Sequence, residues 1–233
     1  MERIILKLSG QALSESGTGI SAKKIEAVVN EIKELASTKN VQIGIVCGAG
    51  NMWRGRDAES NNMDRCLADS IGMLGTVMNS LAVENGLRNA SLKAVTMSAV
   101  PMPSLVKSYT RGDAIDYLEK GYIVIFAGGT GNPYFSTDTA TVLRAIEIEA
   151  EGILLAKAID GVYDSDPKTN PNAKRYDEVS IQEVLDKKLA VVDLTATIMC
   201  LENKMPMYVF GLNEEDSIVK AMSGEFNGTK VTV

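Results

Sequence analysis

The chain has 233 residues, a formal net charge of −6 and no histidine. This length suits one large domain or two lobes that share a core. Without histidine, Ser-His and Cys-His nucleophile pairs, histidine proton shuttles and histidine-containing metal sites are excluded. Any chemistry must therefore use lysine, arginine, carboxylates, hydroxyls and backbone amides, with at most a hard cation that prefers oxygen ligands.

The composition is that of a soluble globular protein, with 45% hydrophobic and 23% charged residues. The acidic balance gives no electrostatic footprint for nucleic acid. The apolar run at the N-terminus is too short for a signal peptide, and we expect no membrane span and a cytoplasmic location. The three cysteines are widely spaced in apolar stretches, which predicts buried, reduced thiols at Cys47, Cys66 and Cys200.

Short β-rich apolar runs alternate with segments of helical period, and this pattern predicts an α/β fold with a mostly parallel central sheet. The expected strands span residues 4–8, 41–47, 92–97, 122–127, 153–156 and 207–210, with residues 230–233 as a terminal edge. Helices are expected after Ser21, over about residues 63–84, after Asp138 and from Ser180. The second helix carries one apolar stripe, formed by Leu67, Ile71, Leu74, Met78 and Leu81. Residues 164–178 are expected to form a long surface loop in a ligand-facing lobe that begins near residue 151.

Three of the expected strands end in a glycine-containing turn: KLSG at residues 7–10, GAGN at residues 48–51 and GGTGNP at residues 128–133. Ligands of open α/β sheets bind outside the carboxyl ends of the strands. Glycine lets backbone amides approach an anion there, and helix N-termini add positive charge. One such turn is equally typical of an ordinary strand end, but three at equivalent ends predict an anion site. The P-loop pattern and the G-x-G-x-x-G pattern are both missing, which disfavours P-loop, Rossmann and protein-kinase sites.

Charged residues stand where an anion would need them. Lys7 lies inside an apolar strand, where a lysine is costly unless its ammonium group emerges near a partner; an edge-strand lysine that blocks aggregation is the alternative. Arg54 follows the second glycine turn and can bind a phosphate through two nitrogens. Arg65 and Asp69 stand four residues apart, so a surface ion pair explains both. Asp69 nevertheless shares a helix face with Gly72, which leaves room for a ligand hydroxyl.

These motifs, together with MDRCLAD at residues 63–69, GTGNPYFSTD at residues 129–138 and DGVYDSDP at residues 160–167, resemble the bacterial uridylate (UMP) kinases of the amino-acid-kinase superfamily. The resemblance runs essentially from end to end. It implies one domain, residues 1–233, with a three-layer αβα sandwich, an acceptor lobe of about residues 1–150 and an ATP-binding lobe of about residues 151–233. It implies phosphoryl transfer from ATP to UMP with Mg²⁺. It also implies a GTP activator near Ser16 to Ser21, a UTP inhibitor and a homohexamer.

Carried over by motif, the resemblance assigns roles to individual residues. Those implied to be catalytic are Lys7, Arg54, Asp138 and Asp193. Those implied to contact ATP are Lys7, Leu8, Ser9, Gly10, Gly50, Arg54, Lys157, Tyr163 and Asp166. Those implied to contact UMP are Ala49, Asp69, Thr130, Gly131, Asn132, Pro133, Tyr134, Phe135, Ser136 and Thr137. No metal ligand set on the protein is implied.

Within this set, the resemblance implies that Asp69 holds the UMP ribose. For the reaction itself, Asp193 is expected to orient Lys7. Asp138 stands at a predicted helix start, so an N-cap is the alternative to a catalytic role.

The chain departs from the family pattern in two places. Ala49 stands between two glycines where the family has a third glycine, so its backbone must adopt a conformation that a Cβ allows. Lys157 and Ala158 stand where the family has threonine and lysine, so the charge at that point comes from a different position.

Two rival hypotheses remain open on the sequence. One is another kinase of the superfamily that acts on an amino-acid carboxylate or a carbamate, which should lack the MDR-x-x-AD helix. The other is a non-catalytic member of the fold that binds nucleotides or anions, which should have lost Lys7 or the paired acids.

Overall fold

The structure is a computed structural model that describes residues 1–38, 40–53, 62–157, 159–212, 216–225 and 227–233. Arg54 and Ala158 lie outside the described residues.

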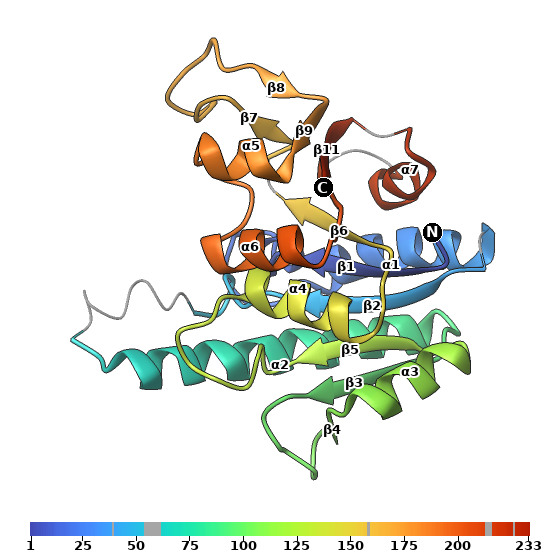
Figure 1. Cartoon of the computed structure of the whole chain (residues 1–233). Coiled ribbons are helices and arrows are strands. Elements are labelled where there is room, and N and C mark those ends of the chain that lie inside the picture. Colours follow the sequence, from blue (N-terminus) through green and yellow to red (C-terminus); the bar gives the residue numbers. More distant parts are fainter. Residues whose placement is uncertain (39, 54–61, 158, 213–215, 226) are drawn as a thin grey trace.

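A large, mostly parallel sheet forms the centre of the described chain (Figure 1). The strand order is β4-β3-β5-β2-β1-β6-β10-β11-β9, and β10–β11 is its antiparallel pair. The strands are β1 (Arg3–Leu8), β2 (Gln42–Cys47), β3 (Ala94–Ser98), β4 (Lys107–Ser108), β5 (Ile123–Ala127), β6 (Gly152–Lys157), β9 (Glu178–Ser180), β10 (Met207–Gly211) and β11 (Gly228–Thr232). A separate hairpin joins β7 (Val162–Tyr163) to β8 (Arg175–Tyr176).

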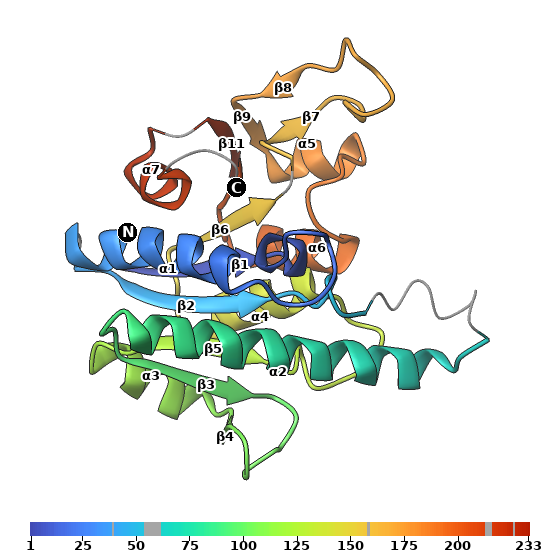
Figure 2. The same cartoon turned by 180° about the vertical axis from the view of Figure 1, so that it is seen from behind.

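Helices cover both faces of this sheet. They are η1 (Gly10–Leu13), α1 (Ala22–Thr38), α2 (Arg65–Asn89), α3 (Arg111–Glu119), α4 (Thr137–Glu147), α5 (Ile181–Asp186), α6 (Leu194–Glu202) and α7 (Ser217–Ser223). Figure 1 shows α3, α4 and α6 in front of the sheet, and Figure 2 shows α1 and α2 on the opposite face.

Side chains of β1 point alternately to the two faces, so Ile5 belongs to the core beneath α3, α4 and α6, whereas Ile4 and Leu6 belong to the core beneath α1 and α2. The predicted three-layer αβα sandwich is confirmed.

The predicted helix starts are also confirmed. The Ser21 hydroxyl accepts a hydrogen bond from the backbone N–H of Lys24 at 3.3 Å, and the Ser180 hydroxyl accepts one from Glu183 at 3.1 Å. Each satisfies an N–H that has no partner within its own helix. The apolar residues of α1 are buried in the core, so they are not an external surface.

Part of the apolar stripe of α2 faces away from the sheet, although Leu81 packs against a small core cluster. Leu67, Leu74 and Met78 are each at least half exposed, while Val83 and Leu87 of the same helix are buried in the core. This helix is long and apolar enough to cross a membrane by length and composition alone. Val83 and Leu87 pack against the sheet as in a core helix, so length and composition alone do not indicate a membrane span.

Three sequence expectations were wrong. Residues 230–233 do not end the sheet, because β11 pairs with β10 on one side and with the short β9 on the other. The expected surface loop at residues 164–178 contains β8 and the first residue of β9. Cys66 is exposed because it lies in the first turn of α2, on the outer side of the helix; Cys47 and Cys200 are buried as predicted.

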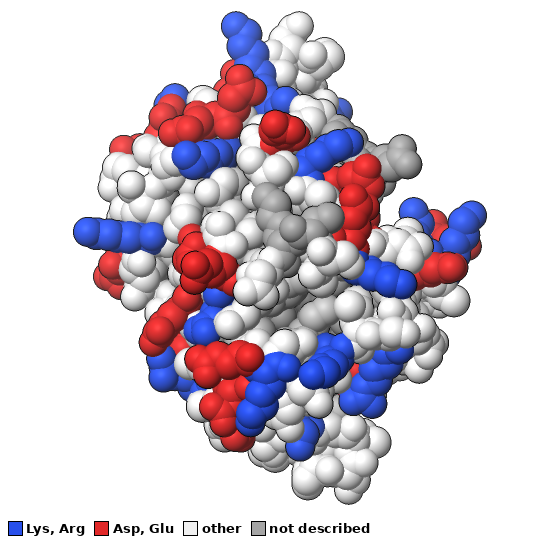
Figure 3. Space-filling model, turned by 90° about the vertical axis from the view of Figure 1, so that its right-hand side faces the viewer, with Lys and Arg blue, Asp and Glu red and all other residues white. Residues whose placement is uncertain are grey.

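The face at the start of the parallel strands carries charges of both signs. Figure 3 shows Lys and Arg side chains beside Asp and Glu over the described part of that face. The net negative charge is therefore not concentrated there.

Candidate active site

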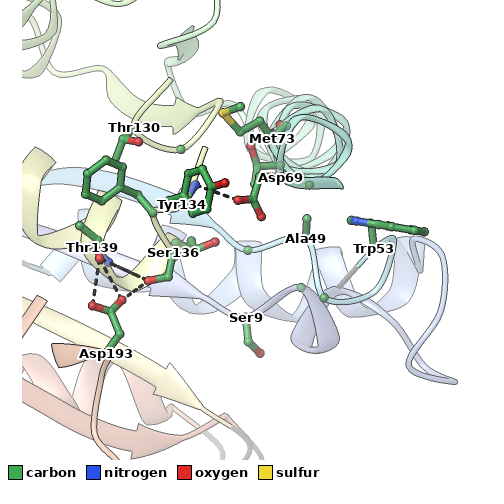
Figure 4. A pocket seen from close by; sticks show the side chains of 18 of the residues that line it. Ser9, Ala49, Trp53, Asp69, Met73, Thr130, Tyr134, Ser136, Thr139 and Asp193 are labelled. Atoms are coloured by element: carbon green, nitrogen blue, oxygen red, sulfur yellow. Dashed lines mark hydrogen bonds between the residues drawn. The ribbon is translucent and has the colours of Figure 1, made fainter. Parts of the chain in front are cut away.

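A cleft of about 880 Å³ lies where the carboxyl ends of β1, β2 and β5 meet α2 and the first turns of α4 and α6. It is lined by thirteen of the residues predicted for the site: Lys7, Ser9, Gly10, Ala49, Gly50, Asp69, Thr130, Asn132, Tyr134, Phe135, Ser136, Thr137 and Asp193. Figure 4 shows Ser9 and Ala49 on one side of this cleft and Thr130, Tyr134 and Ser136 on another. The three glycine turns thus converge, as the sequence predicts.

Gly10 brings the first two turns into direct contact. A Cβ at this position would lie 2.4 Å from Asn51 Oδ1, 2.6 Å from Gly50 N and 2.9 Å from Gly48 O. Asn51 and Asn79 are buried and exchange two amide hydrogen bonds, of 3.1 and 2.7 Å. Asn79 also donates to Gly48 O at 2.7 Å, so the pair fixes the second turn from below.

The alanine between the two glycines of the second turn is accommodated without strain. Ala49 is buried and is not among the described residues with positive φ. Its Cβ lies 3.0 Å from the place where a Cβ on Gly75 of α2 would stand. The missing glycine at position 49 is therefore matched by a glycine on the facing helix.

Lys7 is held by Asp138. Lys7 lies in β1, a central strand between β2 and β6, so the edge-strand interpretation is wrong. Its Nζ is 2.8 Å from Asp138 Oδ1, and both side chains are mostly buried. Burial alone would raise the pKa of Asp138, but the charges of Lys7 and Lys157 outweigh it and hold that pKa below its usual value.

Asp193 has a different role from the one expected. Its side chain caps α6 by accepting from Ala196 N at 2.9 Å, and it accepts from Thr139 Oγ1 and Ser136 Oγ of α4. The expectation that Asp193 orients Lys7 is therefore wrong, because both carboxylate oxygens are used in joining the first turns of α4 and α6. The N-cap of α4 is Ser136, so Asp138 is not a cap.

Lys157 lies beside this group, at the end of β6. Its Nζ donates a hydrogen bond to the backbone oxygen of Val191. Burial lowers the pKa of Lys157, while the attraction of Asp138 acts in the opposite direction. Two lysines and two carboxylates are thus clustered at the carboxyl ends of β1 and β6.

The opposite side of the cleft is built by α2 and the loop that follows β5. Asp69 Oδ2 accepts a hydrogen bond from Tyr134 N at 2.7 Å (Figure 4). It also accepts one from Arg65 Nε at 2.8 Å. Gly128 and Gly129 have positive φ, and Arg144 of α4 donates to the Gly129 carbonyl at 3.3 Å. This part of the site is held by hydrogen bonds to α2 and α4.

Other predicted residues do not line the cleft. Leu8 is fully buried, so only its backbone is available to a ligand. Tyr163 donates its hydroxyl to Asp160 at 2.8 Å, and the Asp166 carboxylate accepts from Lys168 N at 2.9 Å. The remaining ones are Gly131, Pro133, Asp138 and Lys157, with Arg54 outside the described residues.

Sequence reasoning also missed residues that line the cleft. They are Gln11, Trp53, Ala68, Met73, Thr76, Thr139, Lys168, Leu194 and Thr195. Trp53 adjoins the second glycine turn, and Met73 lies one turn beyond Asp69 on α2. Their proximity to known motif residues was the available signal, whereas nothing local in the sequence brings Lys168 to this place.

Comparison with known proteins places this cleft in a family. The amino acid kinase family model matches residues 2–211. A curated relative named uridylate kinase, from Pediococcus pentosaceus, is 46% identical over 99% of this chain and 96% of its own length. The UMP kinase structure from Ureaplasma parvum has a TM-score of 0.94 and 37% identity, covering 100% of this chain and 99% of that one. The UMP kinase structure from Bacillus anthracis has a TM-score of 0.94 and 36% identity, covering 99% and 96%. This chain belongs to the amino acid kinase family and, within it, to the uridylate kinases.

Proposed function

We propose that this chain transfers the γ-phosphoryl group of ATP to UMP, giving ADP and UDP for pyrimidine nucleotide synthesis. The observation that carries the proposal is the single cleft in which Lys7 and the glycine turns face Asp69 and the loop after β5. A phosphoryl-transfer enzyme needs both substrates in one enclosed site, with positive charge between them.

Lys7 and the backbone around it form the donor side. Lys7, Ser9 and Gly10 end a central strand, and Gly50 lies on the facing turn. The first turns of α4 and α6 point at the same space and add the partial positive charge of helix N-termini. Asp138 keeps the Lys7 ammonium in place, so the positive charge is positioned before the substrate arrives. We assign Arg54 to the same task from its motif.

The acceptor needs no general base. A nucleoside monophosphate carries a second phosphate pKa near roughly 6, so its oxygen is already ionised at pH 7. Catalysis therefore depends on alignment and charge neutralisation. Asp69 would hold the ribose, and residues 130–137 would enclose the nucleotide. The histidine-free composition agrees with this chemistry.

The residues of this site fit Mg²⁺ that is bound together with ATP. The described residues contain no group of three or more acidic or cysteine side chains that could hold a metal ion. Mg²⁺ commonly takes substrate phosphates, water and one or two carboxylates instead of an all-protein cage. Bound with ATP, it would neutralise charge on the phosphates, with Asp193, which lines the cleft, and Asp138, which pairs with Lys7, as the carboxylates available to it.

The adenosine part of ATP is assigned to the lobe of about residues 151–233, and UMP to the lobe of about residues 1–150. We place the adenosine near Tyr163, Asp166 and Lys157. All three belong to β6, to the β7–β8 hairpin or to the chain between them. In this assignment Lys157 supplies the positive charge that the family carries one position later, where this chain has Ala158.

The regulatory and assembly properties follow from the family resemblance. We propose a cytoplasmic homohexamer with GTP as activator, bound near Ser16 to Ser21, and UTP as inhibitor. The exposed apolar side chains of Leu67, Leu74 and Met78 support an association of copies through α2. Light scattering after size-exclusion chromatography measures the assembly directly.

A coupled ADP-release assay with UMP, CMP, dUMP, aspartate and glutamate in parallel tests the function. We expect turnover with UMP far above the background ATPase rate and none with the two amino acids. No turnover with UMP would refute the proposal, and turnover with an amino acid would favour the rival kinase hypothesis.

A further inference from the structure

Arg65 forms an ion pair with Asp69 and has further contacts at the cleft. It is about half exposed, but its partner Asp69 keeps only 13% of its side-chain surface. Arg65 also lines the cleft, and its guanidinium carbon lies 5.3 Å from the centre of the Tyr134 ring. It therefore touches both α2 and the loop after β5.

Both donors to Asp69 use the same carboxylate oxygen. Arg65 Nε and Tyr134 N converge on Oδ2, at 2.8 and 2.7 Å. A carboxylate oxygen offers about two lone-pair positions, so these two bonds fill Oδ2. Among the described residues no donor reaches Oδ1. Figure 4 shows this carboxylate extending from α2 into the cleft between Tyr134 and Ala49.

The backbone of Tyr134, which donates one of these two hydrogen bonds, has an unusual conformation. Tyr134 has φ of +72°, a left-handed conformation that costs a non-glycine residue free energy. Its N–H is held by Asp69, and its exposed ring lies under Arg65. The hydrogen bond from Tyr134 N to Asp69 therefore anchors the loop to α2, and Arg65 reaches the same carboxylate oxygen.

We propose that Arg65 is a positioning residue of the acceptor site, which fixes Oδ2 of Asp69 so that Oδ1 faces a ribose hydroxyl of the nucleotide. The proposal rests on the ribose role of Asp69 proposed above. Arg65 acts through Asp69 and needs no contact with the substrate. Removing it leaves Oδ2 with the Tyr134 N–H as its one described donor, so the carboxylate is fixed less firmly and the hydroxyl has a less well-positioned acceptor.

Two other roles for Arg65 make different predictions. As a plain surface ion pair it would affect neither substrate constant. As a direct ligand of the UMP base or phosphate it would affect every acceptor equally, whether or not the ribose hydroxyls are present. Its effect would also add to that of an Asp69 substitution.

The test compares R65A, D69N and the double variant with two acceptors, UMP and 2′,3′-dideoxy-UMP, which lacks both ribose hydroxyls. R111A is the matched control, because Arg111 is 53% exposed against 51% for Arg65 and forms an ion pair with Glu149 outside the cleft. We expect R65A to raise KM for UMP about three- to fivefold with little change in kcat. D69N should raise it about tenfold, and the double variant should match D69N.

With 2′,3′-dideoxy-UMP, R65A and the parent protein should give the same KM. Equal effects of R65A on both acceptors, additive effects in the double variant, or a KM for UMP unchanged from R111A would each overturn the positioning role. If D69N itself fails to distinguish the two acceptors, the ribose role of Asp69 is wrong, and that result is separate from any outcome for R65A.

Discussion

Replacing Gly10 by alanine tests how the donor side is built. A Cβ at this position would lie 2.4 to 2.9 Å from three atoms of the facing turn, where ordinary contacts are 3.4 Å or more. Two of these atoms are backbone, and the third belongs to Asn51, which is buried and paired with Asn79. None can rotate away, so the two turns must separate by about 1 Å, the difference between the shortest contact and an ordinary one.

The expected magnitude follows from this overlap. Forcing a methyl group into a well-packed position costs about 1–3 kcal/mol. For a chain of this length that lowers Tm by roughly 2–12 °C. The same displacement separates Lys7 from the facing turn, and a 1 Å misplacement of catalytic groups can lower the rate by about 100-fold. G10A should therefore lose both stability and kcat.

G50A is the matched control, since Gly50 lies on the other side of the same contact. No described atom lies within 4 Å of a Cβ at this position, and Gly50 is not among the glycines with positive φ. Its methyl group would occupy the cleft instead of the turn. G50A should keep the parent Tm while kcat/KM for ATP falls. Differential scanning calorimetry and steady-state kinetics measure the two effects, and a parent-like G10A, or a G50A equally destabilised, would refute the reasoning.

Three further predictions concern other parts of the chain. K7A should lower kcat by about 100- to 1,000-fold and change KM for UMP far less, as measured by steady-state kinetics; an unchanged kcat would contradict the role of Lys7. Of the three thiols only Cys66 should react rapidly with a thiol reagent in the native protein, because burial raises the pKa of Cys47 and Cys200 to about 12; a second fast thiol would contradict the structure. Burial raises the pKa of Glu31 above 4.5, so the neutral carboxyl favours folding at low pH and this advantage is lost as the pH rises through the folded-state pKa. The Tm of the parent relative to E31Q should fall as the pH rises from 4.5, and a difference that is constant or grows would contradict this.

The sequence predicts the strand ends of this site well because glycine and apolar runs are local signals. The turns at residues 7–10, 48–51 and 128–133 meet in space because the carboxyl ends of parallel strands share one edge of the sheet. What joins the turns was not predictable. Asn51 and Asn79 are 28 residues apart, and no local pattern indicates that their amides pair.

The assignment of Asp138 and Asp193 shows the same limit. On sequence grounds Asp138 stands at a predicted helix start and can be a cap or a catalytic acid, whereas Asp193 is expected to orient Lys7. The structure separates them by geometry, since α4 begins at Thr137 with Ser136 as its cap. This places Asp138 in the first turn, 2.8 Å from Lys7, and leaves Asp193 to cap α6.

The orientation of α2 follows from its close contact with the second glycine turn and not from its hydrophobic pattern. An apolar stripe on a surface helix usually faces the core, yet Leu67, Leu74 and Met78 of this stripe are exposed. At Gly75 the helix approaches the second glycine turn so closely that a Cβ would meet the methyl group of Ala49 at 3.0 Å. Only small side chains fit at this contact, whereas Val83 and Leu87, further along the helix, pack in the core. The same orientation of the helix places Asp69 in the cleft and leaves Leu67, Leu74 and Met78 on the outer surface.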